Sequence, residues 1–262
     1  MWRSSLSCLL VTLALMLSTT WAQAGGFESF GPFSVRALPQ GRYLVTDAIG
    51  RKLHLIPRGQ KPPAGVAPEQ VVFIPVRRVA MSGGQDVSLL ITLDAMDTLV
   101  AVTGGKKPRD WVLEPVRRGL ETGRIVSLGG NHAIDYEQLA TIKPDVFFTW
   151  DESLIPLAAE LKVPVVITYG ELARNLDTQI KFVRFLAPFF GREKEADQYV
   201  ARVRTAVARV RERAKGVKHR PKVIWGDIYE KRVLVEPGHS WAAEIVRLAG
   251  GDYLFDDVRG TS

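Results

Sequence analysis

The sequence predicts an α/β protein of two lobes with mainly parallel sheets, joined by one long α-helix, with the second lobe incomplete. Three observations predict this fold. Apolar strands alternate with helical segments over most of the 262 residues, as in parallel sheets. One later stretch repeats apolar residues at helical spacing over many turns. The chain after that stretch is too short to close a second lobe with its own core.

The first residues predict export. Arg3 is the only charge before the apolar run Leu6–Leu17, and Ala22-Gln23-Ala24 has small residues spaced for signal peptidase. The run is shorter than the roughly 20 apolar residues that a membrane-spanning helix needs. We therefore expect a cleavable signal peptide over residues 1–24 and a periplasmic protein. Cys8 is the only cysteine and lies in this leader, so the mature protein is expected to lack a disulfide, a cysteine nucleophile and a lipid anchor.

The net charge of +7 is moderate for a chain of this length. Attraction to anionic ligands, lipids or nucleic acid is one interpretation, and a solvated basic helix is the other. Much of the excess falls within Arg202–Arg220, which favours the solvated helix. Export argues further against nucleic acid as a partner.

The N-terminal part of the chain predicts a hairpin followed by a βαβ unit. Strands Tyr43–Asp47 and Lys52–Ile56 flank a turn that contains Gly50. After a loop rich in proline and glycine and two apolar runs, Gln85–Met96 is apolar enough for a buried helix, and Thr98–Val102 is a short strand.

The next unit has a clear helix start, a stop and a buried strand. Asp135 can cap the helix, Leu139 and Ile142 give it one apolar face, and Pro144 ends it. The strand Val146–Trp150 follows. A further helix over Ser153–Leu161 and a strand over Val163–Thr168 complete the pattern, and these continuous apolar strands are typical of sheets covered on both faces.

The long helix is expected over Arg192–Lys215. Beyond it we expect strands Lys222–Trp225 and Val233–Val235 and a helix over Ser240–Leu248. The predicted organisation is a signal peptide over 1–24, an N-terminal lobe over 25–190, the interlobe helix over 191–216 and the start of a truncated C-terminal lobe over 217–262.

With these elements in order, the chain resembles the class III periplasmic substrate-binding proteins of ABC importers, the group that delivers ferric siderophores, haem and cobalamin. The resemblance rests on five segments: Val45–Leu53, the helix start with Lys143-Pro144-Asp145, Val163–Val166, the long helix, and Ala249–Phe255. It implies two lobes that clamp a ligand with little hinge motion. It also implies a glutamate on each lobe that docks onto the permease: Glu137 matches the first, whereas His239 stands at the second position.

Candidate ligand contacts lie just past the predicted strand ends, where open α/β sheets bind their ligands. Several are aromatic, and large planar or hydrophobic ligands such as corrinoids, porphyrins and siderophore chelates bind through stacking area. Arg109 can pair with a carboxylate, and Trp241 is a further aromatic candidate. For Trp225 and Trp241 ordinary core packing is the favoured alternative. The predicted contacts are Gln85, Arg109, Trp111, Asn131, His132, Trp150, Tyr169, Trp225, Tyr229 and His239.

Two other functions compete with this interpretation. A zinc or manganese receptor needs convergent histidine and carboxylate ligands, but the four histidines have no paired spacing, although His132 or His239 with a tyrosine can ligate haem iron. A secreted α/β hydrolase needs catalytic residues, and the sequence has no nucleophile elbow, phosphate loop or dinucleotide fingerprint. The sequence therefore predicts a monomeric, non-enzymatic receptor without a cofactor that passes an iron chelate, haem or corrinoid to an ABC permease in the inner membrane.

Overall fold

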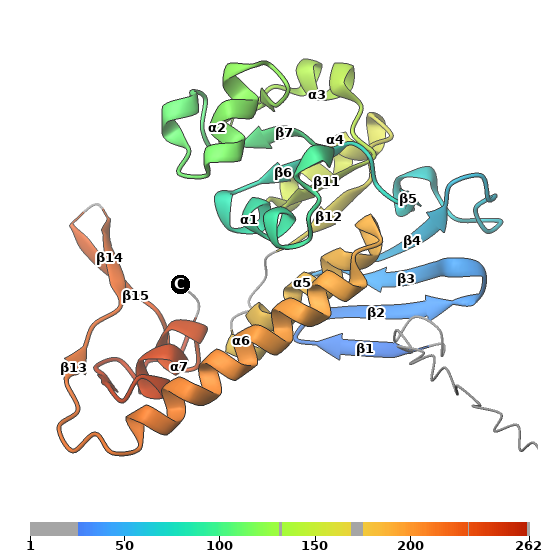
Figure 1. Ribbon diagram of the computed structural model, residues 1–262. Helices are drawn as coiled ribbons and strands as arrows, with labels where there is room; N and C mark the ends of the chain where they lie inside the picture. Colours follow the sequence, from blue (N-terminus) through green and yellow to red (C-terminus); the bar gives the residue numbers. More distant parts are fainter. Residues whose placement is uncertain (1–25, 131–132, 169–174, 230, 261–262) are drawn as a thin grey trace, which may run out of the picture.

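A computed structural model of the chain describes residues 26–260, apart from 131–132, 169–174 and 230. The predicted signal peptide and three predicted contacts, Asn131, His132 and Tyr169, lie outside the described residues. Figure 1 shows two sheets that flank the helix α5, and a long helix α6 that runs from them to a smaller C-terminal group of elements.

The first sheet has five strands in the order β1-β2-β3-β4-β5, of which the first four are antiparallel and β5 is parallel to β4. Its strands are β1 (Phe27–Phe30), β2 (Phe33–Leu38), β3 (Arg42–Thr46), β4 (Lys52–Pro57) and β5 (Val71–Ile74). The predicted hairpin is confirmed as β3 and β4. Asp47, at the end of β3, is fully buried and accepts hydrogen bonds from the amides of Ile49 (3.2 Å), Arg51 (2.9 Å) and Ile167 (3.2 Å). It thereby ties this sheet to the second one.

The second sheet is parallel, as predicted, with the strand order β12-β11-β6-β7-β8. Its strands are β6 (Val79–Ser82), β7 (Leu99–Thr103), β8 (Val126–Ser127), β11 (Val146–Thr149) and β12 (Val165–Ile167). Every residue of β6, β11 and β12 is buried, because helices cover both faces. The segments that connect these strands contain four helices and a small two-stranded ribbon. The helices are α1 (Gly84–Thr92), α2 (Glu114–Glu121), α3 (Tyr136–Ile142) and α4 (Ile155–Glu160), and the ribbon consists of β9 (Gly129–Gly130) and β10 (Ala133–Ile134).

The helix α3 begins and ends as the sequence predicts. The Asp135 carboxylate accepts a hydrogen bond of 2.9 Å from the amide of Gln138, which satisfies a free donor of the first turn. Lys143 has φ +47°, a left-handed conformation that closes the helix before Pro144. Asp145 then accepts hydrogen bonds from Arg58 (2.6 Å) and the amide of Arg77 (2.8 Å), which fixes the start of β11 beside β6.

The helix α5 (Leu176–Phe190) fills the space between the sheets and is an element that the sequence patterns did not predict. Its aromatic residues join the two layers. The rings of Phe182 and Phe185 each lie 4.9 Å from the ring of Phe33 in β2, and the ring of Phe189 lies 5.0 Å from that of Phe148 in β11. These contacts make one continuous core across both sheets.

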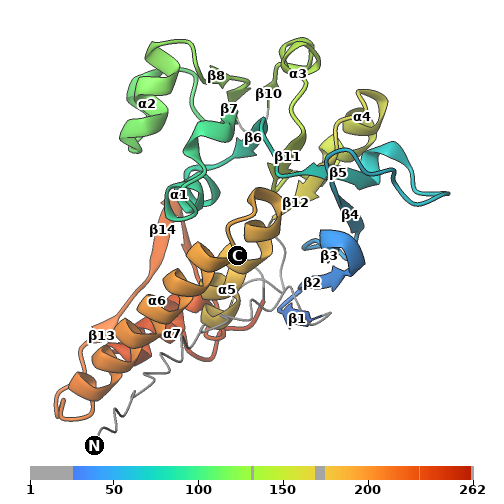
Figure 2. The same ribbon diagram turned by 45° about the vertical axis from the view of Figure 1, so that its right-hand side comes forward.

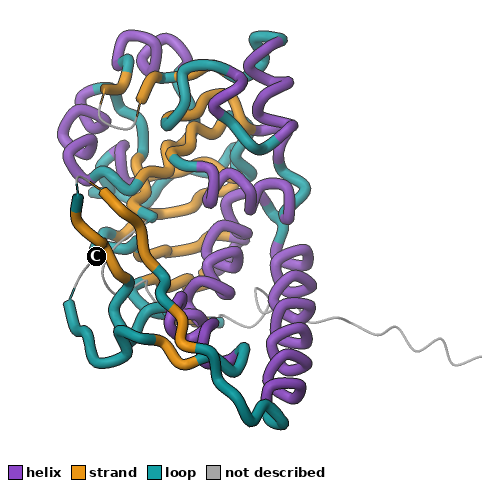
Figure 3. The backbone as a smooth tube through the Cα atoms, turned by 90° about the vertical axis from the view of Figure 1, so that its left-hand side faces the viewer, coloured by secondary structure: helices purple, strands orange, loops and turns teal. Residues whose placement is uncertain are grey.

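The predicted long helix is confirmed as α6 (Glu193–Ala214). Its first half is anchored by the buried Ala196 and Val200, whereas Val210 is 44% exposed. Figures 1 and 2 show its far end beside the C-terminal elements, and Figure 3 shows the chain turning there and returning as a two-stranded ribbon. These elements are β13 (Lys222–Val223), β14 (Gly226–Tyr229), β15 (Arg232–Val235), α7 (Trp241–Leu248) and β16 (Asp252–Tyr253).

The C-terminal group has a small core of its own. Ala243 and Val246 of α7 pack with Tyr253 of β16, and Ser240 caps α7 as predicted, accepting a hydrogen bond of 3.3 Å from the amide of Ala243. Ile228 on β14 is 77% exposed.

Within the part of the chain that the structure describes, no helix has the length and apolar character needed to cross a membrane.

Candidate functional site

A row of hydroxyl groups marks the carboxyl ends of the central parallel strands. Thr103 of β7 donates to Ser82 of β6 over 2.8 Å, and Ser82 donates to Thr149 of β11 over 3.1 Å. The amide of Thr168, just past β12, donates to the Thr149 carbonyl over 2.9 Å. All four side chains are buried. This edge is where open parallel sheets bind their ligands.

A cavity of about 390 Å³, hereafter the cleft, opens beside this edge. It lies between the start of α1, the end of β11, the first turns of α5 and the start of α7. Its walls are aromatic and come from four elements or their ends: Phe33, Trp150, Phe182 and Trp241. Trp150 is 36% exposed, whereas Phe33 and Phe182 are buried.

The remaining cleft residues are small or polar. Gln85 of α1 and Gln179 of α5 face each other, and the amide nitrogen of Gln85 donates to the amide oxygen of Gln179 over 3.0 Å. Thr178 and Thr168 also line the cleft. Aromatic walls with a few polar groups can bind a broad apolar ligand and fix its orientation.

Asp86, in the first turn of α1, also lines the cleft, and sequence reasoning missed it. Its side chain has a hydrogen bond with Thr168, which favours the charged form. Burial outweighs that bond and raises the pKa of Asp86 from 3.8 to about 6. The only sequence signal was its position directly after Gln85, past the end of β6.

Of the residues predicted from the first lobe, Gln85 and Trp150 line the cleft. Trp111 is only 6% exposed, and its ring nitrogen donates to the carbonyl of Gly105 over 3.4 Å. It borders a neighbouring cavity of about 340 Å³ on the other side of Gly83 and Gly84. Arg109 is exposed and lines a surface pocket beside α2.

The C-terminal elements bring one aromatic residue to the cleft. Trp241 lines it, and its ring meets that of Trp225 edge-on at 5.5 Å. Trp225 itself is 41% exposed and therefore lies outside any core. His239 is exposed and does not line the cleft, and the side chain of Tyr229 lies outside the described part of the chain.

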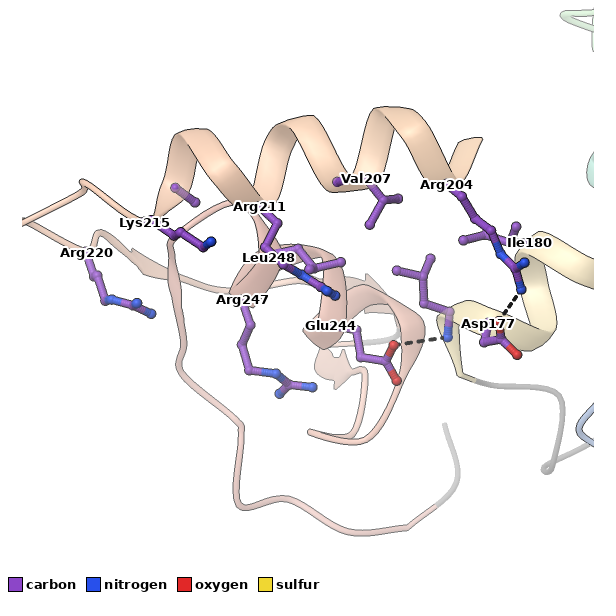
Figure 4. A pocket seen from close by; sticks show the side chains of 13 residues that line it. Asp177, Ile180, Arg204, Val207, Arg211, Lys215, Arg220, Glu244, Arg247 and Leu248 are labelled. Carbon is purple, nitrogen blue, oxygen red and sulfur yellow. Dashed lines mark hydrogen bonds and ion pairs between the residues drawn. The ribbon is translucent and has the colours of Figure 1, made fainter. Parts of the chain in front are cut away.

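A larger groove of about 630 Å³ lies between α5, α6 and α7, away from the strand ends (Figure 4). Most of its charges are engaged within the protein. Arg204 pairs with Asp177 over 3.5 Å, and the Glu244 carboxylate accepts a hydrogen bond of 3.3 Å from the amide of Leu176. Arg247 pairs with Asp256. The first contact joins α6 to α5, the second joins α7 to α5, and the third joins α7 to the segment after β16.

Among the residues that the structure describes, no three histidine, cysteine, aspartate or glutamate side chains lie close enough to hold a metal ion together. Asp86 is the only one of these residue types among the described residues that line the cleft.

The chain is similar to several known proteins. It is 24% identical over 202 residues to an uncharacterised lipoprotein of Methanocaldococcus jannaschii, a match that covers 73% of this chain and 48% of the relative. The chain spans about half the length of the curated relatives it matches.

Solved structures share the fold. A periplasmic binding protein from Veillonella parvula matches with a TM-score of 0.55 and 20% identity, covering 71% of this chain and 61% of that one. The periplasmic vitamin B12 binding protein of Vibrio cholerae matches with a TM-score of 0.51 and 16% identity, covering 71% and 69% of the two chains. A haem-complexed protein of S. aureus matches with a TM-score of 0.51 and 19% identity, covering 68% and 64%.

These structural matches show a common α/β fold, which agrees with the resemblance found in the sequence. The family is shown by a separate comparison: a family model described as periplasmic binding protein matches residues 79–260, which is more than half of the chain. The protein therefore belongs to the periplasmic binding protein family.

Proposed function

We propose that this protein is the receptor of an ABC importer, and that it captures an iron chelate, haem or a corrinoid in the cleft and passes it to an inner-membrane permease without catalysing a reaction. The observation that carries the proposal is the set of aromatic walls at the carboxyl ends of the parallel strands. Aromatic faces bind broad planar ligands through contact area, and the polar groups between them fix the orientation. The vitamin B12 and haem proteins among the similar structures support this choice of ligands.

The proposed ligand contacts are Gln85 and Trp150 on one side of the cleft and Trp241 on the other. A ligand between the two tryptophans joins the parallel-sheet part of the protein to α7. This arrangement agrees with the predicted division into a lobe over 25–190, an interlobe helix over 191–216 and a second lobe from 217 onward. Those boundaries remain a proposal.

The proposed permease contact is Glu137. Its side chain is exposed in the first turn of α3, which lies at the surface of the parallel-sheet lobe (Figure 1). A negative charge there also stabilises the start of the helix. Docking on the permease and stabilisation of the helix can be told apart. Only the loss of docking slows transport while it leaves ligand affinity unchanged.

We further propose that the protein acts in the periplasm as a monomer, after cleavage of residues 1–24 and without a lipid anchor. One of the relatives is a lipoprotein, so the absence of a lipid anchor is the part of this proposal that needs a test. The mass of the exported protein distinguishes the two forms, because an acylated product is heavier than the chain cleaved before Gly25. An acylated product contradicts this part of the proposal.

The ligand proposal is tested by titrating the full-length exported protein with cobinamide, haem and a ferric hydroxamate while following tryptophan fluorescence. We expect saturable binding of at least one probe with quenching, because two tryptophans line the cleft. Tyr136→Ala is a suitable control, since this exposed aromatic residue lies on α3 outside the cleft. Failure of all three probes to bind contradicts the proposed function.

A further inference from the structure

One feature of the cleft is unrelated to aromatic stacking. Asp86 is the only side chain with a formal charge among the described residues that line the cleft. The other side chains that line the cleft come from several elements and are neutral, among them Thr168 after β12, which contacts Asp86, Gln179 on α5 and Trp241 on α7. The acid therefore shares the cleft with hydrogen-bonding and aromatic groups, and no described cation lines the cleft.

A structural role does not account for this acid. A carboxylate in the first turn of a helix stabilises the helix, but an exposed position achieves this without desolvation. Asp86 is instead partly buried in the cleft, where burial raises its pKa and its side chain has a hydrogen bond with Thr168. The cost of burying an acid is offset when a ligand supplies a donor or a cation, and strongly perturbed acids in cavities mark such sites.

We propose that Asp86 is the ligand-discriminating residue of the cleft: it accepts hydrogen bonds from ligands that carry N–H, O–H or cationic groups at their rim, and it rejects ligands that place carboxylates there. This inference rests on the proposed function, because it concerns the same cleft. An amide or ammonium group on the ligand replaces the water that the Asp86 carboxyl has lost. A carboxylate in the same place faces a like charge with little water to screen it, which is unfavourable.

The consequence is a choice among the proposed ligand classes. A corrinoid whose periphery ends in amides offers donors to Asp86, and so does a hydroxamate chelate with a free ammonium group. Haem carries two carboxylates, and its affinity is lowered wherever one of them approaches Asp86. The cleft is thereby selective through one side chain, while the aromatic walls serve all classes alike.

Matched ligand pairs test the proposal. Cobinamide and cobyrinic acid share the corrin ring but carry amides and carboxylates respectively at its rim, and ferrioxamine B carries a free ammonium group where its N-succinyl derivative carries a carboxylate. In whichever pair binds, we expect the wild-type protein to prefer the amide or ammonium member by about tenfold or more. Asp86→Asn, which keeps the shape and an acceptor oxygen, should reduce that preference to about threefold or less.

The control is Asp97→Asn, which changes an exposed acid beyond the far end of α1. It should retain the wild-type preference, and thermal melting of all three proteins shows that each is folded. An unchanged preference in Asp86→Asn, or a wild-type preference for the carboxylate member, overturns the inference while leaving the proposed function intact. Failure of the wild-type protein to bind any probe overturns the proposed function itself.

Discussion

Asp86→Asn should change how the stability of the protein depends on pH, even without a ligand. Burial raises the pKa of Asp86 from 3.8 to about 6, a difference of about two units. Each unit corresponds to about 1.4 kcal/mol, so ionised Asp86 lowers the free energy of unfolding by up to about 3 kcal/mol. Because the side chain keeps some exposure, we expect a loss of about 1–3 kcal/mol.

The direction in which the free energy of unfolding changes with pH follows from proton binding by Asp86. Between the two pKa values the folded protein holds the proton and the unfolded chain has released it, so this group makes stability fall as the pH rises. Below about pH 4 both states are protonated and the penalty is absent. Above the folded-state pKa of about 6 the penalty is complete. Asparagine does not titrate, so the variant avoids the penalty altogether.

Urea unfolding followed by tryptophan fluorescence measures this effect. At about pH 3.5 Asp86→Asn should match the wild-type protein, and at about pH 7.5 it should be more stable by about 1–3 kcal/mol. Asp97→Asn, which changes an exposed acid, should show no such difference at either pH. A difference between Asp86→Asn and wild type that stays constant with pH refutes the reasoning.

Four further predictions concern the fold and the proposed sites. Asp47→Ala leaves three backbone amides without their acceptor, one of them buried, and should cost about 3–5 kcal/mol in urea unfolding; a cost below about 1 kcal/mol contradicts its role in joining the sheets. Phe185→Ala removes a fully buried ring of the shared core and should also cost about 3–5 kcal/mol by the same measurement. Trp150→Ala should weaken binding of the preferred probe about tenfold while Tyr136→Ala leaves it unchanged, and equal effects of the two argue against the cleft. Glu137→Lys should preserve affinity but slow uptake into cells, and normal uptake removes the docking role.

The parts of the fold that were predictable are those specified by local chemistry. Asp135 and Pro144 define the start and stop of α3 through a cap and a missing amide, and both act within a few residues. The strands β3 and β4 follow from their alternation and the turn at Gly50. In contrast, α5 was missed because its second half, Phe185–Phe190, is a continuous apolar run that contains Pro188, and such a run shows no helical period.

The candidate site was only partly predictable. The rule that ligands bind past strand ends found Gln85 and Trp150, because both directly follow β6 and β11 in the chain. The same rule suggested Trp111, but the turn over Pro108–Asp110 directs its ring beneath Gly105 into the core. Asp86 depends on Thr168 approaching from another strand, and such a contact leaves no sign in the sequence.

The central claim is that the ligand binds in the cleft, and hydrogen–deuterium exchange with and without the preferred probe tests it most directly. We predict that the probe slows exchange at the start of α1 and after the end of β11, because Asp86 and Trp150 lie there. The groove of Figure 4, lined by Arg211 and Leu248, should exchange at the same rate in both states. Protection confined to that groove, with none around Asp86 and Trp150, contradicts the account.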